Sequence, residues 1–268
     1  MFTLQSKVFP PNAPALRVAL EESLRRVVRP VGEMVTVEEQ QYPRLASIRV
    51  LLDHADAGDR PPPRPAPPVG KVEAGLEVEN FEMSGRPILL QGARVELSCT
   101  AREVRIGQGR DAEGNVLLLL QDAAEGKVEV ALALSDLEAL VRAGAKVAAA
   151  KQGVTVEEVR IELQARSERA LDVVVQVRAK KLFLSAAMRI SGSVAIDEQL
   201  QARFSGWECV GDGTLGTLAC GFITPQLARL NGREFSLLAL PLGEVKLREV
   251  RIAAGRELRV TAHFGRAA

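Results

Sequence analysis

Three glycines have the spacing that nucleotide chemistry would need. Gly211, Gly213 and Gly216 match the GxGxxG pattern, after a strand-like run and before a helix-like run. The match comes late in the chain, and strands of antiparallel character flank it instead of the repeated βαβ units of a dinucleotide fold. We therefore interpret these glycines as a turn with close backbone packing.

The histidines and cysteines provide no recognisable site. His54 and His263 are far apart in sequence, and neither has a cysteine or carboxylate at the spacing of metal ligands. Cys99, Cys209 and Cys220 are odd in number and lack CxxC spacing, so we expect reduced thiols in a packed interior. We expect no catalytic residues, no metal and no cofactor, and hence a protein that is not an enzyme.

The composition also excludes several classes. The chain has 268 residues and a formal net charge of +1, without a basic block that contains aromatic residues, which disfavours nucleic-acid binding. The first residues lack the apolar run of a signal peptide, and no run of about 18 apolar residues could span a membrane. We expect a soluble cytoplasmic protein that is at most peripheral to a membrane.

Three helices are expected, of which the second and third should cover a sheet. The first spans about 13–29, with Pro14 in its first turn and Pro30 ending it. The second spans about 135–152, with Ser135 and Glu138 as a capping box and Gly144 allowing a close approach. The third, 214–230, is free of charge until Arg229 and therefore has to be covered on most sides.

The rest of the chain is rich in strands. Residues 101–106, 156–161 and 247–252 share one pattern, and each is followed by a polar turn and a second strand, which predicts hairpins. Apolar and polar residues alternate with a period of two in 171–180 and 257–264, as in antiparallel sheets with one covered face. Six prolines lie between Pro61 and Pro68, so residues 55–69 are expected to form an exposed proline-rich loop within a single domain of residues 1–268.

The order of elements resembles a known family. An Asp-Leu helix entered directly from a strand (130–137), and a late apolar helix followed by Leu-Pro-Leu-Gly (240–243) and a Val-Arg-Ile hairpin, carry the resemblance. These features look like the bacterial LmeA-like phospholipid-binding family of the tubular lipid-binding (TULIP) superfamily. The resemblance implies an α+β fold, in which a long, strongly curved antiparallel sheet is rolled around two or three amphipathic helices, with a groove for acyl chains. Members of the family commonly enter the cell envelope, and the proline-rich insertion is not part of its pattern.

Our leading hypothesis is non-enzymatic binding of a lipid or other elongated apolar ligand between the helices and the sheet, with transfer of that ligand between membranes as an extension. The residues expected to line the groove are apolar positions on the second and third helices: Leu137, Leu140, Val141, Leu215, Leu218, Phe222, Ile223 and Leu227. The expected partners are the ligand and a transient membrane surface, without nucleic acid. The alternatives are a scaffold with a self-filled core that binds proteins through the proline-rich loop or a sheet edge, and a nucleotide-dependent enzyme using the glycine turn.

Overall fold

The computed structural model describes the chain except for residues 59–65, 151–153, 182–183, 240–244 and 267–268. The chain forms two compact units. Unit 1 comprises Met1–Val130, Ala239–Glu249 and Thr261–Ala268, and unit 2 comprises Ala131–Leu238 and Val250–Val260. The expectation of one domain over the whole chain stays a prediction. The Leu-Pro-Leu-Gly turn and most of the proline run lie outside the described residues.

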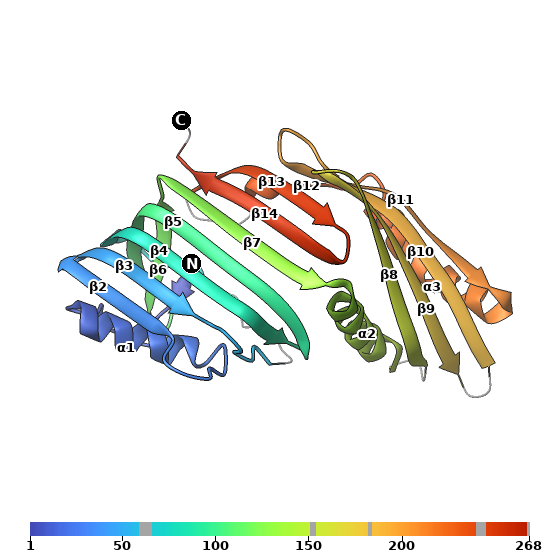
Figure 1. The fold of residues 1–268 in the computed structure, drawn as a ribbon, viewed down its shortest axis with the longest axis horizontal. Coiled ribbons are helices and arrows are strands. Elements are labelled where there is room, and N and C mark those ends of the chain that lie inside the picture. Colours follow the sequence, from blue (N-terminus) through green and yellow to red (C-terminus); the bar gives the residue numbers. More distant parts are fainter. Residues whose placement is uncertain (59–65, 151–153, 182–183, 240–244, 267–268) are drawn as a thin grey trace. The chain divides into compact units, whose positions relative to one another are not determined.

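Unit 1 is built on a nine-stranded sheet whose main path runs β13-β14-β7-β5-β4-β3-β2, with β6 paired to β5 and β1 paired to β6 (Figure 1). The last two strands, β13 and β14, contribute residues to both units. The strands are β1 (Phe2–Thr3), β2 (Val35–Gln41), β3 (Arg44–Leu51), β4 (Glu73–Leu90), β5 (Ala93–Arg110), β6 (Val116–Asp122), β7 (Glu125–Ala133), β13 (Lys246–Ala254) and β14 (Glu257–Gly265). Antiparallel pairing dominates, but β3 and β4 are parallel.

Helix α1 (Ala13–Leu24) lies next to β2 in unit 1 (Figure 1). Its N-cap is Asn12, whose side-chain oxygen accepts a hydrogen bond from the Ala15 N–H at 2.9 Å. The helix ends at Leu24, five residues before the Arg29 end expected from Pro30. Leu16 and Leu20 on its apolar side are buried.

Unit 2 is built on a five-stranded antiparallel sheet in the order β12-β11-β10-β9-β8. Its strands are β8 (Thr155–Ser167), β9 (Ala170–Lys181), β10 (Leu184–Ile196), β11 (Gln201–Asp212) and β12 (Glu234–Ser236), and a short 3-10 helix η1 (Leu237–Ala239) follows β12. Helices α2 (Leu134–Ala150) and α3 (Gly213–Leu230) complete the unit. No helix in the described ranges is long and apolar enough to cross a membrane.

Both helices of unit 2 pack on the same face of its sheet. Ile161, Val175, Ile190 and Cys209 are successive cross-strand partners, so their side chains share one face. Ile161 and Val175 belong to a cluster that α2 covers, whereas Cys209 is bonded to α3. The opposite face carries the polar residues of the same strands, which confirms the alternation expected for 171–180.

The α2 helix differs in detail from its prediction. Glu138 does not complete a capping box, because its carboxylate accepts a hydrogen bond at 2.9 Å from the backbone N–H of Ile161 on the edge strand β8. Gly144 is exposed and has nothing near its Cα that a side chain would meet, so it permits no close approach. Val147 is also exposed, at 70%. The apolar side of α2 is therefore narrower than expected.

The fold class is confirmed at its coarser level: the protein is α+β, with large sheets that are mostly antiparallel and three α-helices among the described residues. The three expected hairpins are the pairs β5–β6, β8–β9 and β13–β14. Each hairpin joins neighbours in sequence, which is why local alternation and turn residues were enough to predict it.

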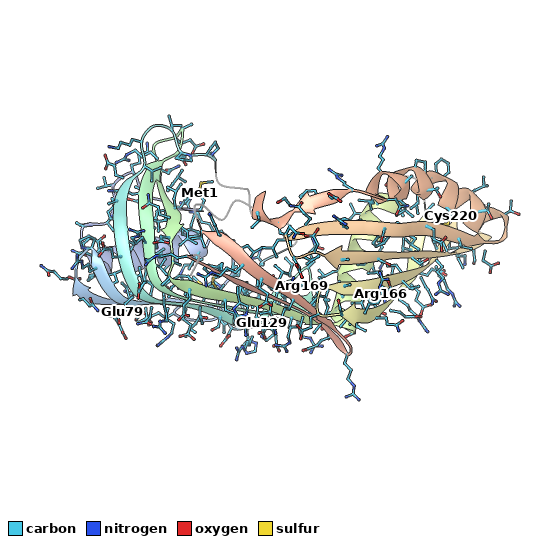
Figure 2. The ribbon with its side chains drawn as sticks, turned by 90° about the horizontal axis from the view of Figure 1, so that it is seen from above. Met1, Glu79, Glu129, Arg166, Arg169 and Cys220 are labelled. Carbon is cyan, nitrogen blue, oxygen red and sulfur yellow. A yellow bond between two sulfur atoms is a disulfide. The ribbon has the colours of Figure 1, made fainter. Side chains whose placement is uncertain are left out.

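The expectation of three reduced thiols is wrong for two of them. Cys220 on α3 (Figure 2) forms a disulfide with Cys209 on β11. The Cα–Cα distance is 5.5 Å, and Cys99 is free. The pair was missed because α3 folds directly back onto the strand before it and brings together residues 11 apart, a spacing that matches no known motif. Since structural disulfides persist mainly in oxidising compartments, the cysteines no longer support the cytoplasmic expectation.

We predict that the disulfide stabilises unit 2 by restricting its unfolded chain. Replacing both cysteines (Cys209→Ala with Cys220→Ala) should lower the free energy of unfolding by about 2–3 kcal/mol, as expected for so short a closed loop. Urea unfolding followed by circular dichroism measures the change, with and without dithiothreitol. The reductant should destabilise the unmodified protein and leave the double variant unchanged; an equal response of both proteins would contradict the prediction.

Candidate functional site

Unit 1 contains an apolar cavity of about 280 Å³ that is partly open to solvent. Its walls come from α1, five strands of the sheet and the first residues of the chain. The lining residues are Met1, Phe2, Leu20, Leu24, Ile48, Val50, Phe81, Met83, Cys99, Ala101, Val104, Ile106, Leu118, Leu120 and Phe264. None of these side chains is charged, so the cavity suits an apolar ligand.

Two cross-strand rows form the sheet wall of the cavity. Ile48, Phe81 and Ala101 are direct partners across β3, β4 and β5, and Val50, Met83 and Cys99 form the next row. Direct partners lie on the same face of a sheet, and residues two apart on a strand do so as well. The register therefore places all six side chains on the cavity side.

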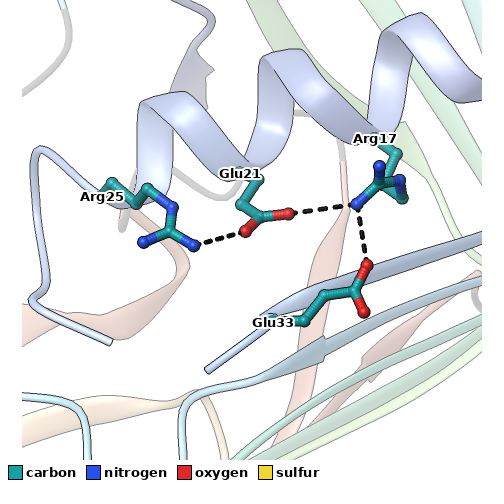
Figure 3. Close-up of polar contacts among 4 residues, drawn as sticks. All are labelled: Arg17, Glu21, Arg25 and Glu33. Carbon is teal, nitrogen blue, oxygen red and sulfur yellow. Dashed lines mark hydrogen bonds and ion pairs between the residues drawn. The ribbon is translucent and has the colours of Figure 1, made fainter. Parts of the chain in front are cut away.

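Helix α1 forms the wall opposite these rows, because its charged side is held toward solvent. Glu21 accepts hydrogen bonds from Arg17 at 3.3 Å and from Arg25 at 2.6 Å, and Arg17 also contacts Glu33 at 2.8 Å (Figure 3). Glu21 and Arg25 are four residues apart, the spacing at which opposite charges on a helix pair. Glu21 is 14% exposed, but its partners Arg17 and Arg25 are 39% and 49% exposed, so these ion pairs contribute little energy individually. Their placement shows which side of α1 is wet, and Leu20 and Leu24 lie on the other side.

A buried serine connects the first residues of the chain to α1. The Ser23 hydroxyl, 3% exposed, donates to the Ala19 carbonyl at 2.6 Å and accepts from the Gln5 N–H at 2.9 Å. Leu4 is fully buried, and Phe2 pairs with Leu118 of β6. These contacts fix Phe2 as part of the cavity wall. Sequence reasoning missed this contribution because a two-residue strand has no periodicity.

Two backbone features complete the wall. Ala101 and Val104 are three residues apart, so regular alternation would put them on opposite faces. Glu103, between them, has φ of 48°, and this left-handed residue interrupts the alternation so that both line the cavity. On β7, a side chain at Gly126 would come within 2.2 Å of the Phe264 ring, so the absence of one makes room for that ring.

Cys99 is the polar exception in the wall, and it is only weakly polar. Burial raises the pKa of its thiol to about 11, which keeps it neutral near pH 7. A neutral thiol behaves as a small apolar group with a weak hydrogen-bond donor. The side chains of the cavity therefore offer no charge to a ligand.

The residues predicted to line a groove lie elsewhere. None of the eight lines this cavity. Leu137 and Val141 pack on a filled cluster formed around Val156, Val159 and Ile161, and Leu140 is half-buried. On α3, Leu227 is buried and Leu215 and Ile223 are half-buried.

Leu218 and Phe222 correct the prediction most directly, because they are 57% and 70% exposed. The sequence of α3 is free of charge until Arg229, and we therefore expected cover on most of its sides. The sheet covers one side only. The other side presents both residues to solvent.

The glycine turn has the packing role that we expected. A side-chain carbon on Gly211 would come within 2.0 Å of the Gly216 backbone, and Gly213 has φ of 67°. Beyond the other end of α3, the side-chain amide of Asn231 accepts from the Trp207 N–H at 2.7 Å and donates to its carbonyl at 2.8 Å. Both ends of α3 are thus fixed to β11.

A second hollow, of about 450 Å³, lies on the polar face of the unit 2 sheet. It is lined in part by Arg160, Arg178 and Arg189 together with Glu158 and Asp212. Glu158 accepts a hydrogen bond from Arg160 at 2.7 Å and lies 3.6 Å from Arg178. The Arg160 hydrogen bond holds the pKa of Glu158 below its usual value. These groups are exposed, and the arrangement is that of a solvated sheet face.

Comparison with known proteins adds no assignment: no family model matches the chain, and no curated protein or solved structure is significantly similar to it. Within the described ranges, no cluster of three or more His, Cys, Asp or Glu side chains could hold a metal ion. The apolar cavity of unit 1 is therefore the feature on which a functional proposal can be built.

We predict that Cys99 reacts slowly with alkylating reagents. The thiolate is the nucleophile, and with a pKa of about 11 only a small fraction ionises at pH 8. N-ethylmaleimide should modify Cys99 on the order of a hundredfold more slowly than free cysteine. The rate should rise about tenfold per pH unit toward pH 11 while the fold persists by circular dichroism. A rate that levels off below pH 9 would contradict the raised pKa.

Proposed function

We propose that the protein binds a lipid or another elongated apolar ligand, without catalysing a reaction, in the cavity of unit 1. The observation that carries the proposal is a lining composed entirely of uncharged, mostly apolar side chains beneath an amphipathic helix. Each buried CH₂ of a ligand would contribute about 0.8 kcal/mol. Transfer of that ligand between membranes is the natural extension.

The resemblance to the LmeA-like family and the TULIP superfamily supports the same proposal. It implies a strongly curved sheet around helices, with acyl chains held between them. The α+β class and the mostly antiparallel sheets agree with that arrangement at a coarse level. The proposed site differs from the expected one: it lies between α1 and β3–β6, not beneath α2 and α3.

Native mass spectrometry of the purified protein tests the proposal directly. We expect a co-purifying apolar molecule, and its presence should protect Cys99 from N-ethylmaleimide. Ala101→Glu places a charge in the cavity wall and should reduce binding by more than about tenfold, because a buried unpaired charge is costly. Thr100→Glu is the matched control, since Thr100 is exposed on the other face of the same strand.

Absence of a bound molecule from the unmodified protein, together with failure of added decanoate to protect Cys99, would remove the proposal. Equal binding by the Ala101→Glu and Thr100→Glu variants would place the ligand outside this cavity. Unfolding curves of both variants separate lost binding from lost folding.

The exposed side of α3 is the surface that we propose for transient membrane contact. Leu218 and Phe222 are exposed there, and the sole charge on the helix is the cation Arg229 in its last turn. Apolar side chains beside a cation suit an anionic bilayer surface.

Replacing both apolar residues (Leu218→Ser with Phe222→Ser) should lower co-sedimentation with phosphatidylglycerol vesicles by about tenfold, because both side chains would otherwise enter the lipid. Val210→Ser is the control. Val210 is 60% exposed, but it lies on β11 in the row of Arg189, on the sheet face away from α3. Equal loss in the control and the double variant would contradict membrane contact through α3.

The alternative is a scaffold that binds proteins, and the filled cluster under α2 favours it for unit 2. A pull-down of protein partners that is lost on deletion of residues 59–68, combined with absence of lipid binding, would select this alternative.

A further inference from the structure

The size of the unit 1 cavity limits what it can hold. An engineered protein cavity of about 150 Å³ binds benzene, which corresponds to about 25 Å³ for each carbon atom. At about 280 Å³, the cavity between α1 and the sheet has room for about eleven carbons. This is less than one full-length acyl chain of a membrane lipid and much less than the two chains of a phospholipid.

We propose that the cavity holds about ten to twelve carbons of a single hydrocarbon chain and leaves the polar headgroup of the ligand in solvent. This assignment rests on the proposed function, since it specifies the ligand of the same site. The resemblance to the TULIP superfamily implies a groove for acyl chains, and the cavity volume adds a limit on their length.

The chemistry of the lining explains why the headgroup remains outside. The wall has no charged side chain, and it has no hydrogen-bonding side chain apart from Cys99. A carboxylate, hydroxyl or amide taken into such a cavity would lose its hydrogen bonds to water without replacement, which is strongly unfavourable. Selection must therefore act on the length of the chain and not on the headgroup.

Two lining residues are suited to changing the volume of the cavity. Phe81 and Ala101 belong to one row of the wall, and Met83 and Cys99 belong to the next. Ala101 is the smallest residue of the lining, and Met83 is among the most adaptable. A larger residue at position 101 should shorten the space, and a smaller residue at position 83 should extend it.

The assignment can be tested with a series of straight-chain fatty acids of about eight to eighteen carbons. Each fatty acid is measured by its displacement of a fluorescent probe from the full chain. Affinity should rise about fourfold for each added methylene up to about eleven carbons, and then stop rising. A rise that continues to sixteen or eighteen carbons would overturn the length assignment and leave the proposed function intact. Absence of binding at every length would remove the proposed function itself.

The chain length at which affinity stops rising is the break in the series. Two variants should move this break in opposite directions. Ala101→Leu adds three carbon atoms to the wall and should shift the break about three carbons shorter, whereas Met83→Ala should shift it about three carbons longer. Thr100→Leu, on the exposed face of the same strand, should leave the break in place. General destabilisation would weaken binding at all chain lengths alike and would leave the position of the break unchanged. A break that moves in the same direction in both variants, or that does not move in either, would overturn the assignment.

The headgroup is tested at constant chain length. Decanoate, decanol and decanamide should bind within about threefold of one another, because each leaves its polar group in water. A preference of more than about tenfold for one of them would show a polar recognition site and overturn the inference that the headgroup lies outside.

Discussion

The register that joins β3, β4 and β5 is the constraint on which the rest of unit 1 depends. It places Ile48, Phe81 and Ala101 in one row, so β3 and the β4–β5 hairpin present a continuous apolar wall. A slip of one residue would exchange this wall for charged side chains such as Arg49 and Glu82. The position of α1, the burial of its leucines and the apolar cavity all follow from that register.

Unit 2 also packs helices on a sheet with one apolar face, but the space under its helix α2 is filled by side chains. Those of α2 itself fill the space above Val156, Val159 and Ile161. The α3 helix is held by the Cys209–Cys220 disulfide and by Asn231 at its end, and it therefore stays on the sheet even though Leu218 and Phe222 face solvent. The difference between a filled and an unfilled space lies in the side chains and not in the fold class.

Local patterns predicted the elements well and the site poorly. Alternation and turn residues identified the three hairpins, and 3.6-residue periodicity identified the three helices to within a few residues at most ends. The site depends on pairings that no local pattern contains: the parallel β3–β4 pair, the contact of Ser23 with Gln5, and the left-handed φ of Glu103. The exposed side of α3 was mispredicted because hydrophobicity shows which residues favour burial and not whether a partner covers them.

Alternation along the strands of unit 1 places the cavity wall and the charged outer surface on opposite faces of the sheet. Val50 contributes to the cavity wall while its neighbour Arg49 pairs with Glu82 on the solvent face, 3.1 Å away. Ala101 and Arg102, which pairs with Glu125 at 3.0 Å, repeat the arrangement on β5. Substitutions at inward positions can therefore change the size of the cavity without disturbing the charges that keep the outer surface hydrated. Single changes at these positions would remodel the interior of unit 1 while its outer face remained the same.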